Sequence, residues 1–325
     1  MTSISPIIVS ASRSTDIPAF YSKWFVNRIK AGYCVWYNPF NRQPTQVRFD
    51  KTKVVVFWTK NPKPLIPFLR ELDDRGIFYY FQFTLNDYQK ELLEPNVPKL
   101  SERIDTFKRL SDLIGKEKVI WRFDPLILTS TIDPDRLIDK MKLVGDKIHN
   151  YTEKLVFSFA DIVDYKKVRN NLTRDGIDYK DWDEDQMNAM ARSIMEINKN
   201  WNLEVATCAE KIDLDRLGIK HNRCIDGELM KRIFKEDKDL VYYLTFGRMP
   251  ERTLFGDEKD LPPVDITKLK DKGQRKTCGC MISKDIGMYN TCLHLCEYCY
   301  ANTSKEIVMK NRCLVSDNAE SIIKG

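Results

Sequence analysis

Histidine, glycine and long hydrophobic runs are scarce in this chain of 325 residues. Its only histidines are His149, His221 and His294, too few for a hydrolytic zinc site built on several imidazoles. Thirteen glycines exclude collagen-like and glycine-rich low-complexity sequence. No apolar run approaches the roughly 18 residues of a membrane-spanning helix, and residues 1–6 lack a basic start to a secretory signal. We therefore expect a cytoplasmic protein that contacts no membrane.

Charge and cysteine content are more informative. The chain has 53 Lys and Arg against 47 Asp and Glu, a net charge of only +6, and 42% of its residues are hydrophobic, as in a soluble globular protein. It has nine cysteines. Because cytosolic thiols stay reduced, clustered cysteines in that compartment more often bind metal or do chemistry than form disulfides.

Apolar runs alternate with amphipathic stretches through the first 210 residues or so. The runs that predict strands are Pro6–Ser10, Val54–Trp58, Phe78–Phe83, Val119–Phe123, Leu155–Phe159 and Leu203–Thr207. The stretches that predict helices are Tyr21–Ala31, Pro64–Arg75, Lys99–Leu113, Asp135–Lys147 and Asp183–Trp201. Unbroken hydrophobic strands alternating with helices are typical of a parallel sheet covered by helices. The sequence predicts an α/β fold, either a wound sheet or a partial (β/α)6 barrel.

Two further features complete the organisation. Residues 34–37 and 46–49 predict a hairpin inserted after the first β-α unit. From about residue 253 the chain turns polar and lysine-rich, which is typical of a linker, and it then reaches a cysteine-rich tail. We expect residues 1–250 to form the β/α part, and residues 251–325 to form a linker and cysteine segment that packs on it as one structural unit.

Charged and polar side chains follow the predicted strands. They include Arg13, Asp16, Lys60, Arg122, Asp124 and Glu210. In barrels and open α/β sheets the ligands bind at the carboxyl ends of the strands, where these residues would converge. Turn formation, helix capping and salt bridges are the alternative roles for each of them.

The tail contains the sharpest motif, a Cys-x3-Cys-x2-Cys array at Cys292, Cys296 and Cys299, named here the cysteine triad. Three thiolates on one short loop can hold three irons of a 4Fe-4S cluster and leave the fourth iron open for chemistry. A zinc site of three cysteines and His294 is the alternative. His294 lies between two of the cysteines, so it cannot easily complete a tetrahedron with both.

Four other cysteines make a second group, named here the four-thiol set: Cys208, Cys224, Cys278 and Cys280. Four thiolates are the number that a closed iron-sulfur or zinc site requires. An auxiliary cluster, a structural zinc ion and unliganded buried cysteines are the three interpretations. Cys34 and Cys313 belong to neither group.

The triad resembles the signature of radical S-adenosylmethionine enzymes, with Tyr298 in the place of their adenine-side aromatic residue. Residues 292–302 are similar to the cluster loop of the spore photoproduct lyase branch. The whole chain, from about residue 8 to 304, resembles the bacterial family called domain of unknown function 1848. The motifs that carry this resemblance are Ser10–Pro18, Phe57–Pro62, Trp121–Pro125, Cys208–Glu210, Cys224–Gly227 and Cys278–Cys280.

The resemblance implies a partial barrel of the radical S-adenosylmethionine type, but with its cluster loop near the C-terminus instead of after the first strand. Either the barrel is circularly permuted, or the tail folds back to the barrel mouth. The implied cofactors are a 4Fe-4S cluster at the triad and S-adenosylmethionine; the auxiliary-cluster interpretation of the four-thiol set would add a second cluster. The implied partner is a reductant such as a flavodoxin or ferredoxin.

The same resemblance suggests roles for the strand-end residues. Lys60, Arg122 and Asp124 are the candidate catalytic residues. The candidate cofactor-binding residues are Tyr298, Arg13, Asp16 and Glu210. The substrate is unknown, with nucleic acid or a nucleotide suggested by analogy. The alternative is a non-enzymatic zinc- or iron-sulfur-binding protein that binds nucleic acid or a protein partner.

Overall fold

The computed structural model describes residues 1–250, 269–271, 273–275 and 278–323. Its largest sheet has eight strands in the order β12-β11-β9-β7-β6-β5-β2-β13, and every pairing in it is parallel. The six inner strands of this sheet are β2 (Ile8–Ala11), β5 (Val54–Thr59), β6 (Phe78–Thr84), β7 (Val119–Leu126), β9 (Lys154–Phe159) and β11 (Glu204–Thr207). All six predicted strands are thereby confirmed, as is the α/β class.

The six strands follow one another across the sheet in chain order, so the sheet is wound in one direction. Short strands extend both edges, β12 (Lys220–His221) beside β11 and β13 (Lys284–Asp285) beside β2. Within the described residues the sheet is therefore open at these two edges. The unreversed strand order distinguishes this sheet from a doubly wound one, in which the order reverses.

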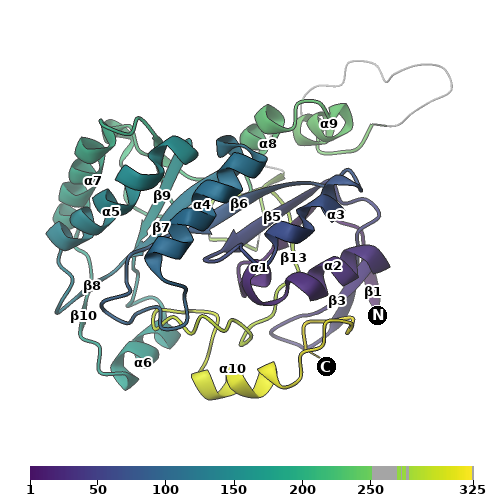
Figure 1. Cartoon of the computed structure of the whole chain (residues 1–325), viewed down its shortest axis with the longest axis horizontal. Helices are drawn as coiled ribbons and strands as arrows, with labels where there is room; N and C mark the ends of the chain where they lie inside the picture. Colours follow the sequence, from purple (N-terminus) through teal and green to yellow (C-terminus); the bar gives the residue numbers. More distant parts are fainter. Residues whose placement is uncertain (251–268, 272, 276–277, 324–325) are drawn as a thin grey trace.

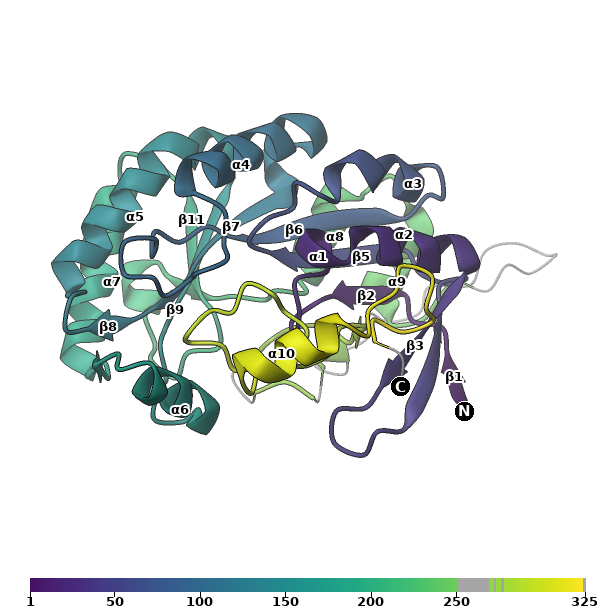
Figure 2. The same ribbon diagram turned by 60° about the horizontal axis from the view of Figure 1, so that its bottom comes forward.

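Helices occupy the connections between the strands. They are α2 (Ser22–Ala31), α3 (Leu69–Asp73), α4 (Leu100–Ile114), α5 (Pro134–Ile148), α6 (Lys166–Arg174) and α7 (Glu184–Asn198). Figures 1 and 2 show α4, α5 and α7 along one side of the sheet and the C-terminal segment, in yellow, on another. The predicted helix at 64–75 is shorter than expected. A 3-10 turn at Ile66–Phe68 precedes α3, because Pro67 cannot donate the backbone bond of an α-helix interior.

Each face of the sheet has its own core. Val55 and Phe57 of β5 belong to the core under the outer helices. Val54 and Val56 belong to a second core on the opposite face. Alternate side chains of a strand point to opposite faces, so an unbroken apolar run fills both cores. The second core is closed by α8 (Gly227–Ile233), α9 (Lys238–Phe246) and residues of the C-terminal segment.

The predicted hairpin is confirmed as β3 (Tyr33–Tyr37) and β4 (Pro44–Arg48), which pair antiparallel, with β1 (Thr2–Ile4) added beside β4. Four further elements are short: α1 (Ile17–Phe20), β8 (Leu128–Thr129), β10 (Tyr179–Lys180) and α10 (Lys305–Arg312). Asp133 caps α5, and Asp183 forms a capping box with Gln186 at the start of α7.

The C-terminal segment returns to the N-terminal half of the sheet. β13 pairs with β2, and the Trp24 indole donates to the Ala319 carbonyl at 2.9 Å. The Val35 backbone N–H of the hairpin also donates to the Glu320 carbonyl at 2.7 Å. Residues 251–268 of the predicted linker lie outside the described residues. Among the helices that the structure describes, none is long and apolar enough to cross a bilayer.

Candidate functional site

A cavity of about 530 Å³ lies where the parallel strands end. The sheet supplies one wall of it. Side chains from the carboxyl-terminal parts of the six strands, or from just after them, line this wall: Ser12, Lys60, Thr84, Asp124, Ser158 and Cys208, with Arg122 from the middle of β7. This is the position at which β/α proteins bind their ligands.

The C-terminal segment supplies the facing wall, with all three cysteines of the triad. Two contacts fix the triad loop to the segments that connect the strands. The Tyr21 hydroxyl donates to the Thr291 carbonyl at 2.6 Å, and the Glu297 backbone N–H donates to the Leu93 carbonyl at 3.0 Å. The fold thus brings the triad loop, near residue 295, to the carboxyl ends of strands of which the first begins at residue 8.

The triad thiols are held in a poorly hydrated environment. Burial raises the pKa of Cys292 to about 12 and also raises the pKa of Cys296 and of Cys299. Thiolates in this cavity therefore need a compensating positive charge. Among the described residues, no three His, Cys, Asp or Glu side chains converge on a point that would suit a single metal ion.

His294 and Asp16 lock the triad loop to α1. His294 is buried, with Nε2 lying 2.8 Å from Asp16 Oδ2 and Nδ1 lying 3.4 Å from the Asn96 carbonyl oxygen. Asp16 also accepts the backbone N–H of Lys60 at 2.7 Å and caps α1 through the N–H of Ala19 at 2.9 Å. Both ring nitrogens of His294 have protein partners, so neither is free to complete a zinc site with the triad.

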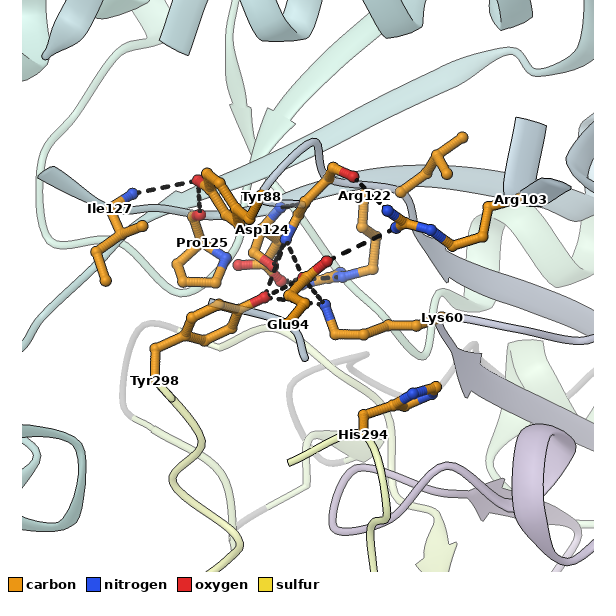
Figure 3. Close-up of polar contacts among 12 residues, drawn as sticks. Lys60, Tyr88, Glu94, Arg103, Arg122, Asp124, Pro125, Ile127, His294 and Tyr298 are labelled. Carbon is orange, nitrogen blue, oxygen red and sulfur yellow. Dashed lines mark hydrogen bonds and ion pairs between the residues drawn. The ribbon is translucent and has the colours of Figure 1, made fainter. Parts of the chain in front are cut away.

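Lys60 and Tyr298 meet at a buried carboxylate, Glu94, as Figure 3 shows. Lys60 Nζ lies 2.6 Å from Glu94 Oε1 and 3.0 Å from the Tyr298 hydroxyl, which itself donates to Glu94. Arg103 Nη1 lies 3.7 Å from the other Glu94 oxygen. Burial opposes ionisation of Glu94, but Lys60 and Arg103 outweigh it and lower the pKa of this carboxyl to about 2.

Arg122 and Asp124 form a second ion pair at the end of β7. The guanidinium bonds Asp124 through both Nε, at 3.1 Å, and Nη2, and Ser158 donates to the same carboxylate. Asn86 links the two pairs, because its amide donates to Glu94 at 3.2 Å and to the Asp124 carbonyl at 3.1 Å. Lys60, Arg122 and Asp124 thus have protein partners, as the salt-bridge alternative predicted.

Arg13 differs from the other cations of the cavity. Its guanidinium lies over the Trp58 ring at 5.0 Å, and Nη1 is 3.8 Å from Asp271. Nη2 is buried and has no hydrogen-bond partner among the described residues. An unsatisfied buried donor on a residue that lines a cavity is a candidate anchor for an anionic ligand.

Glu210 lies beside the cavity and accepts the backbone N–H of Phe159 at 2.9 Å. Burial raises the pKa of this carboxyl to about 8, reinforced by the negative charges of Asp161 and Asp124. Buried carboxyl groups with a pKa displaced in this way concentrate at functional sites.

The four-thiol set is also brought together. Its members lie in three separate segments, yet all four line the same cavity as the triad. The sulfurs of Cys208 and Cys224 are 3.6 Å apart. Of the other two cysteines, Cys34 is buried in the outer core and Cys313 is exposed, and neither lines this cavity.

Asn86 was among the polar residues expected after the predicted strands, but sequence reasoning missed Glu94 and Asp285. Asp285 accepts the Ser10 hydroxyl at 2.6 Å and the Arg13 backbone N–H at 2.8 Å. Glu94 lies in a connecting segment with no motif around it, and Asp285 in a strand of two residues. Their importance depends on partners far away in the chain, for which the sequence carries no local signal.

Fold and cavity together define an α/β protein in which a singly wound parallel sheet carries a cysteine-lined cavity at its strand ends. The chain belongs to the family described as a domain of unknown function (DUF1848), whose model matches residues 8–301. This confirms the family expected from the sequence motifs.

Other comparisons add little. Among solved structures, the chain is similar to a proposed alpha-L-fucosidase from Bacteroides thetaiotaomicron, at 11% identity over 57% of this chain and 84% of that chain, with a TM-score of 0.26. A likeness at that score supports no conclusion about fold or activity. A search of curated proteins found no match.

Proposed function

We propose that the protein is a radical S-adenosylmethionine enzyme on a partial β/α barrel whose cluster loop comes from the C-terminus. The observation that carries this proposal is the position of the cysteine triad, which lines one cavity together with the ends of six parallel strands. When bound by the triad, a 4Fe-4S cluster with one open iron supplies the electron that cleaves S-adenosylmethionine to a 5′-deoxyadenosyl radical.

The triad fits such a cluster better than a single ion. A cubane cluster gives each thiolate its own iron, so the three sulfurs need not converge on one point. A mononuclear zinc site would need them all about 2.3 Å from one ion, and it would need a fourth ligand, for which His294 is already engaged by Asp16.

The chain's own residues orient ligands and exclude water. Glu94 and Lys60 hold the Tyr298 hydroxyl, so the aromatic ring next to Cys299 has a fixed position at the cavity. The Arg13 guanidinium offers Nη2 to a carboxylate or phosphate. Lys60 and Arg122 neutralise carboxylates of the protein, so their proposed role is to position neighbouring groups, with no direct contact to substrate.

The proposal is tested by anaerobic purification of the protein, which we expect to be brown, followed by incubation with dithionite and S-adenosylmethionine. Release of 5′-deoxyadenosine is the expected result. Replacing the three triad cysteines by alanine removes that release, whereas Cys34→Ala and Cys313→Ala, outside the cavity, preserve it. A colourless protein with stoichiometric zinc after anaerobic iron reconstitution would overturn the proposal.

A reductant of the flavodoxin or ferredoxin type takes the place of dithionite in the proposed physiological reaction. The resemblance to spore photoproduct lyases makes nucleic acid the first substrate class to test. Deuterium transfer from labelled nucleic acids, peptides and small metabolites into 5′-deoxyadenosine identifies the class that the radical attacks.

A further inference from the structure

The four-thiol set is assembled from three segments that the fold fixes independently. Cys208 follows β11, and its backbone N–H donates to the Phe157 carbonyl at 2.8 Å. Cys224 precedes α8, and its carbonyl accepts the Tyr80 hydroxyl at 2.6 Å and the Gln82 amide at 3.0 Å. The backbone around these two thiols is therefore held in place by strands β6, β9 and β11.

The third segment carries Cys278 and Cys280. Its backbone pairs with the loop before α8, because the N–H of Met281 donates to the Ile225 carbonyl at 3.1 Å. The Cys280 sulfur lies beside Cys224, whose backbone N–H it accepts at 3.1 Å. The sulfurs of Cys208 and Cys224 are 3.6 Å apart, and Cys278 lines the same cavity as the other three cysteines.

The sulfurs accept N–H donors in the way that metal-bound thiolates do. Cys224 Sγ accepts Arg122 Nη1 at 3.2 Å and Asn222 Nδ2 at 3.3 Å. Cys280 Sγ accepts the backbone N–H groups of Cys224 at 3.1 Å and Ile225 at 3.4 Å. A neutral thiol is a weak acceptor, whereas a guanidinium and three amides directed at two buried sulfurs are the donors that would stabilise the negative charge of cluster-bound thiolates.

We propose that the four-thiol set holds a second iron-sulfur centre in which every iron is ligated by the protein. Tetrathiolate sites select zinc or iron-sulfur centres. A zinc ion needs all four sulfurs about 2.3 Å from one point, and no such convergence of even three side chains exists among the described residues. Iron-sulfur clusters divide four thiolates among two or four irons, so the four sulfurs need not surround one point, and the 3.6 Å between Cys208 and Cys224 is a separation that two ligands of one iron can have.

Closed ligation leaves no iron open to a substrate, so this centre transfers electrons or stabilises the fold. It also ties residues 278–280 to the sheet, next to β13. Arg122 is a positioning residue for the second centre, because its guanidinium donates a charged hydrogen bond to the Cys224 sulfur at 3.2 Å. Hydrogen bonds and charge at cluster sulfurs raise the reduction potential. The inference does not rest on the proposed radical chemistry.

The test uses full-length protein with the triad replaced by alanine, purified anaerobically. This variant is expected to retain iron and acid-labile sulfide in equal amounts, at about two or four per chain. Adding Cys224→Ala removes both, whereas adding Cys34→Ala or Cys313→Ala changes neither. Iron near zero in the folded triad variant, stoichiometric zinc in its place, or a Cys208–Cys224 disulfide would each overturn the proposal.

Two further measurements guard against a variant that fails to fold. Cys224→Ala alone, in a chain with the triad intact, is expected to lose the iron of the second centre only. Arg122→Gln and the milder Asn222→Ala are expected to lower the midpoint potential of the centre in redox titration, in that order of size. An unchanged potential in both variants contradicts ligation at Cys224. Loss of S-adenosylmethionine cleavage without loss of this centre refutes only the radical proposal.

Discussion

Replacing Glu94 by glutamine tests how the cavity wall is held together. The Glu94 side chain is only 1% exposed, and its carboxylate is 2.6 Å from Lys60 Nζ and 3.7 Å from Arg103 Nη1. Arg103 is itself 2% exposed, so water cannot replace the lost charge. Glutamine keeps the shape of the side chain, but it leaves two cations in the interior without their anion.

The expected loss of stability can be worked out in two ways. The difference between the ordinary pKa of 4.5 and about 2 in the folded protein corresponds to about 3 kcal/mol. Breaking a buried ion pair by removing one partner costs about 3–5 kcal/mol in other proteins. We therefore expect Glu94→Gln to lower the free energy of unfolding by about 3–5 kcal/mol near pH 7.

The same carboxylate predicts a pH dependence. Because its pKa is lower folded than unfolded, its stabilisation is complete above the unfolded value of 4.5 and is lost as the pH falls toward about 2. The wild-type protein should lose the stabilisation from Glu94 as the pH falls from 4.5 to about 2. The Glu94→Gln protein lacks that stabilisation at every pH, so the difference in unfolding free energy between the two proteins should shrink as the pH falls.

Urea unfolding followed by circular dichroism at pH 7 and at steps down to pH 3 measures both effects. Glu71→Gln is the matched control, because Glu71 pairs with Arg75 at 2.8 Å on the surface. A surface pair contributes less than about 1 kcal/mol. The reasoning is refuted if Glu94→Gln costs no more than Glu71→Gln, or if its deficit is the same at pH 3 and pH 7.

Two glycines give further predictions. A methyl group at Gly145, inside α5, would lie 2.3 Å from the Trp201 ring. Although alanine has the better helix propensity, Gly145→Ala should therefore lower the free energy of unfolding by about 1–3 kcal/mol. A urea midpoint equal to or higher than that of the wild type would contradict this packing. A methyl at Gly287 would lie 2.5 Å from Ser12 Cβ, which no side-chain rotation relieves. Gly287→Ala should therefore loosen the C-terminal segment, seen as faster amide exchange beside β13, and unchanged exchange there would contradict the close approach.

Much of the architecture could be predicted from the sequence because it is encoded locally. The apolar runs that become β5 and β6 fill both faces of a covered parallel sheet, and that pattern needs no knowledge of distant residues. Asp133 and Asp183 mark helix starts through bonds to their own next turn. The predicted helix at 64–75 was less accurate, because Pro67 shortens it.

The sequence by itself determined the α/β class, the family and the spacing of the cysteine triad, since each depends on residues close together in the chain. Only the tertiary structure decided that Glu94 meets Lys60 and Tyr298, and that Cys208 lies 3.6 Å from Cys224. Such contacts form when the chain closes over long loops, at a cost in conformational entropy that packing of the whole core must offset. No local pattern records that balance.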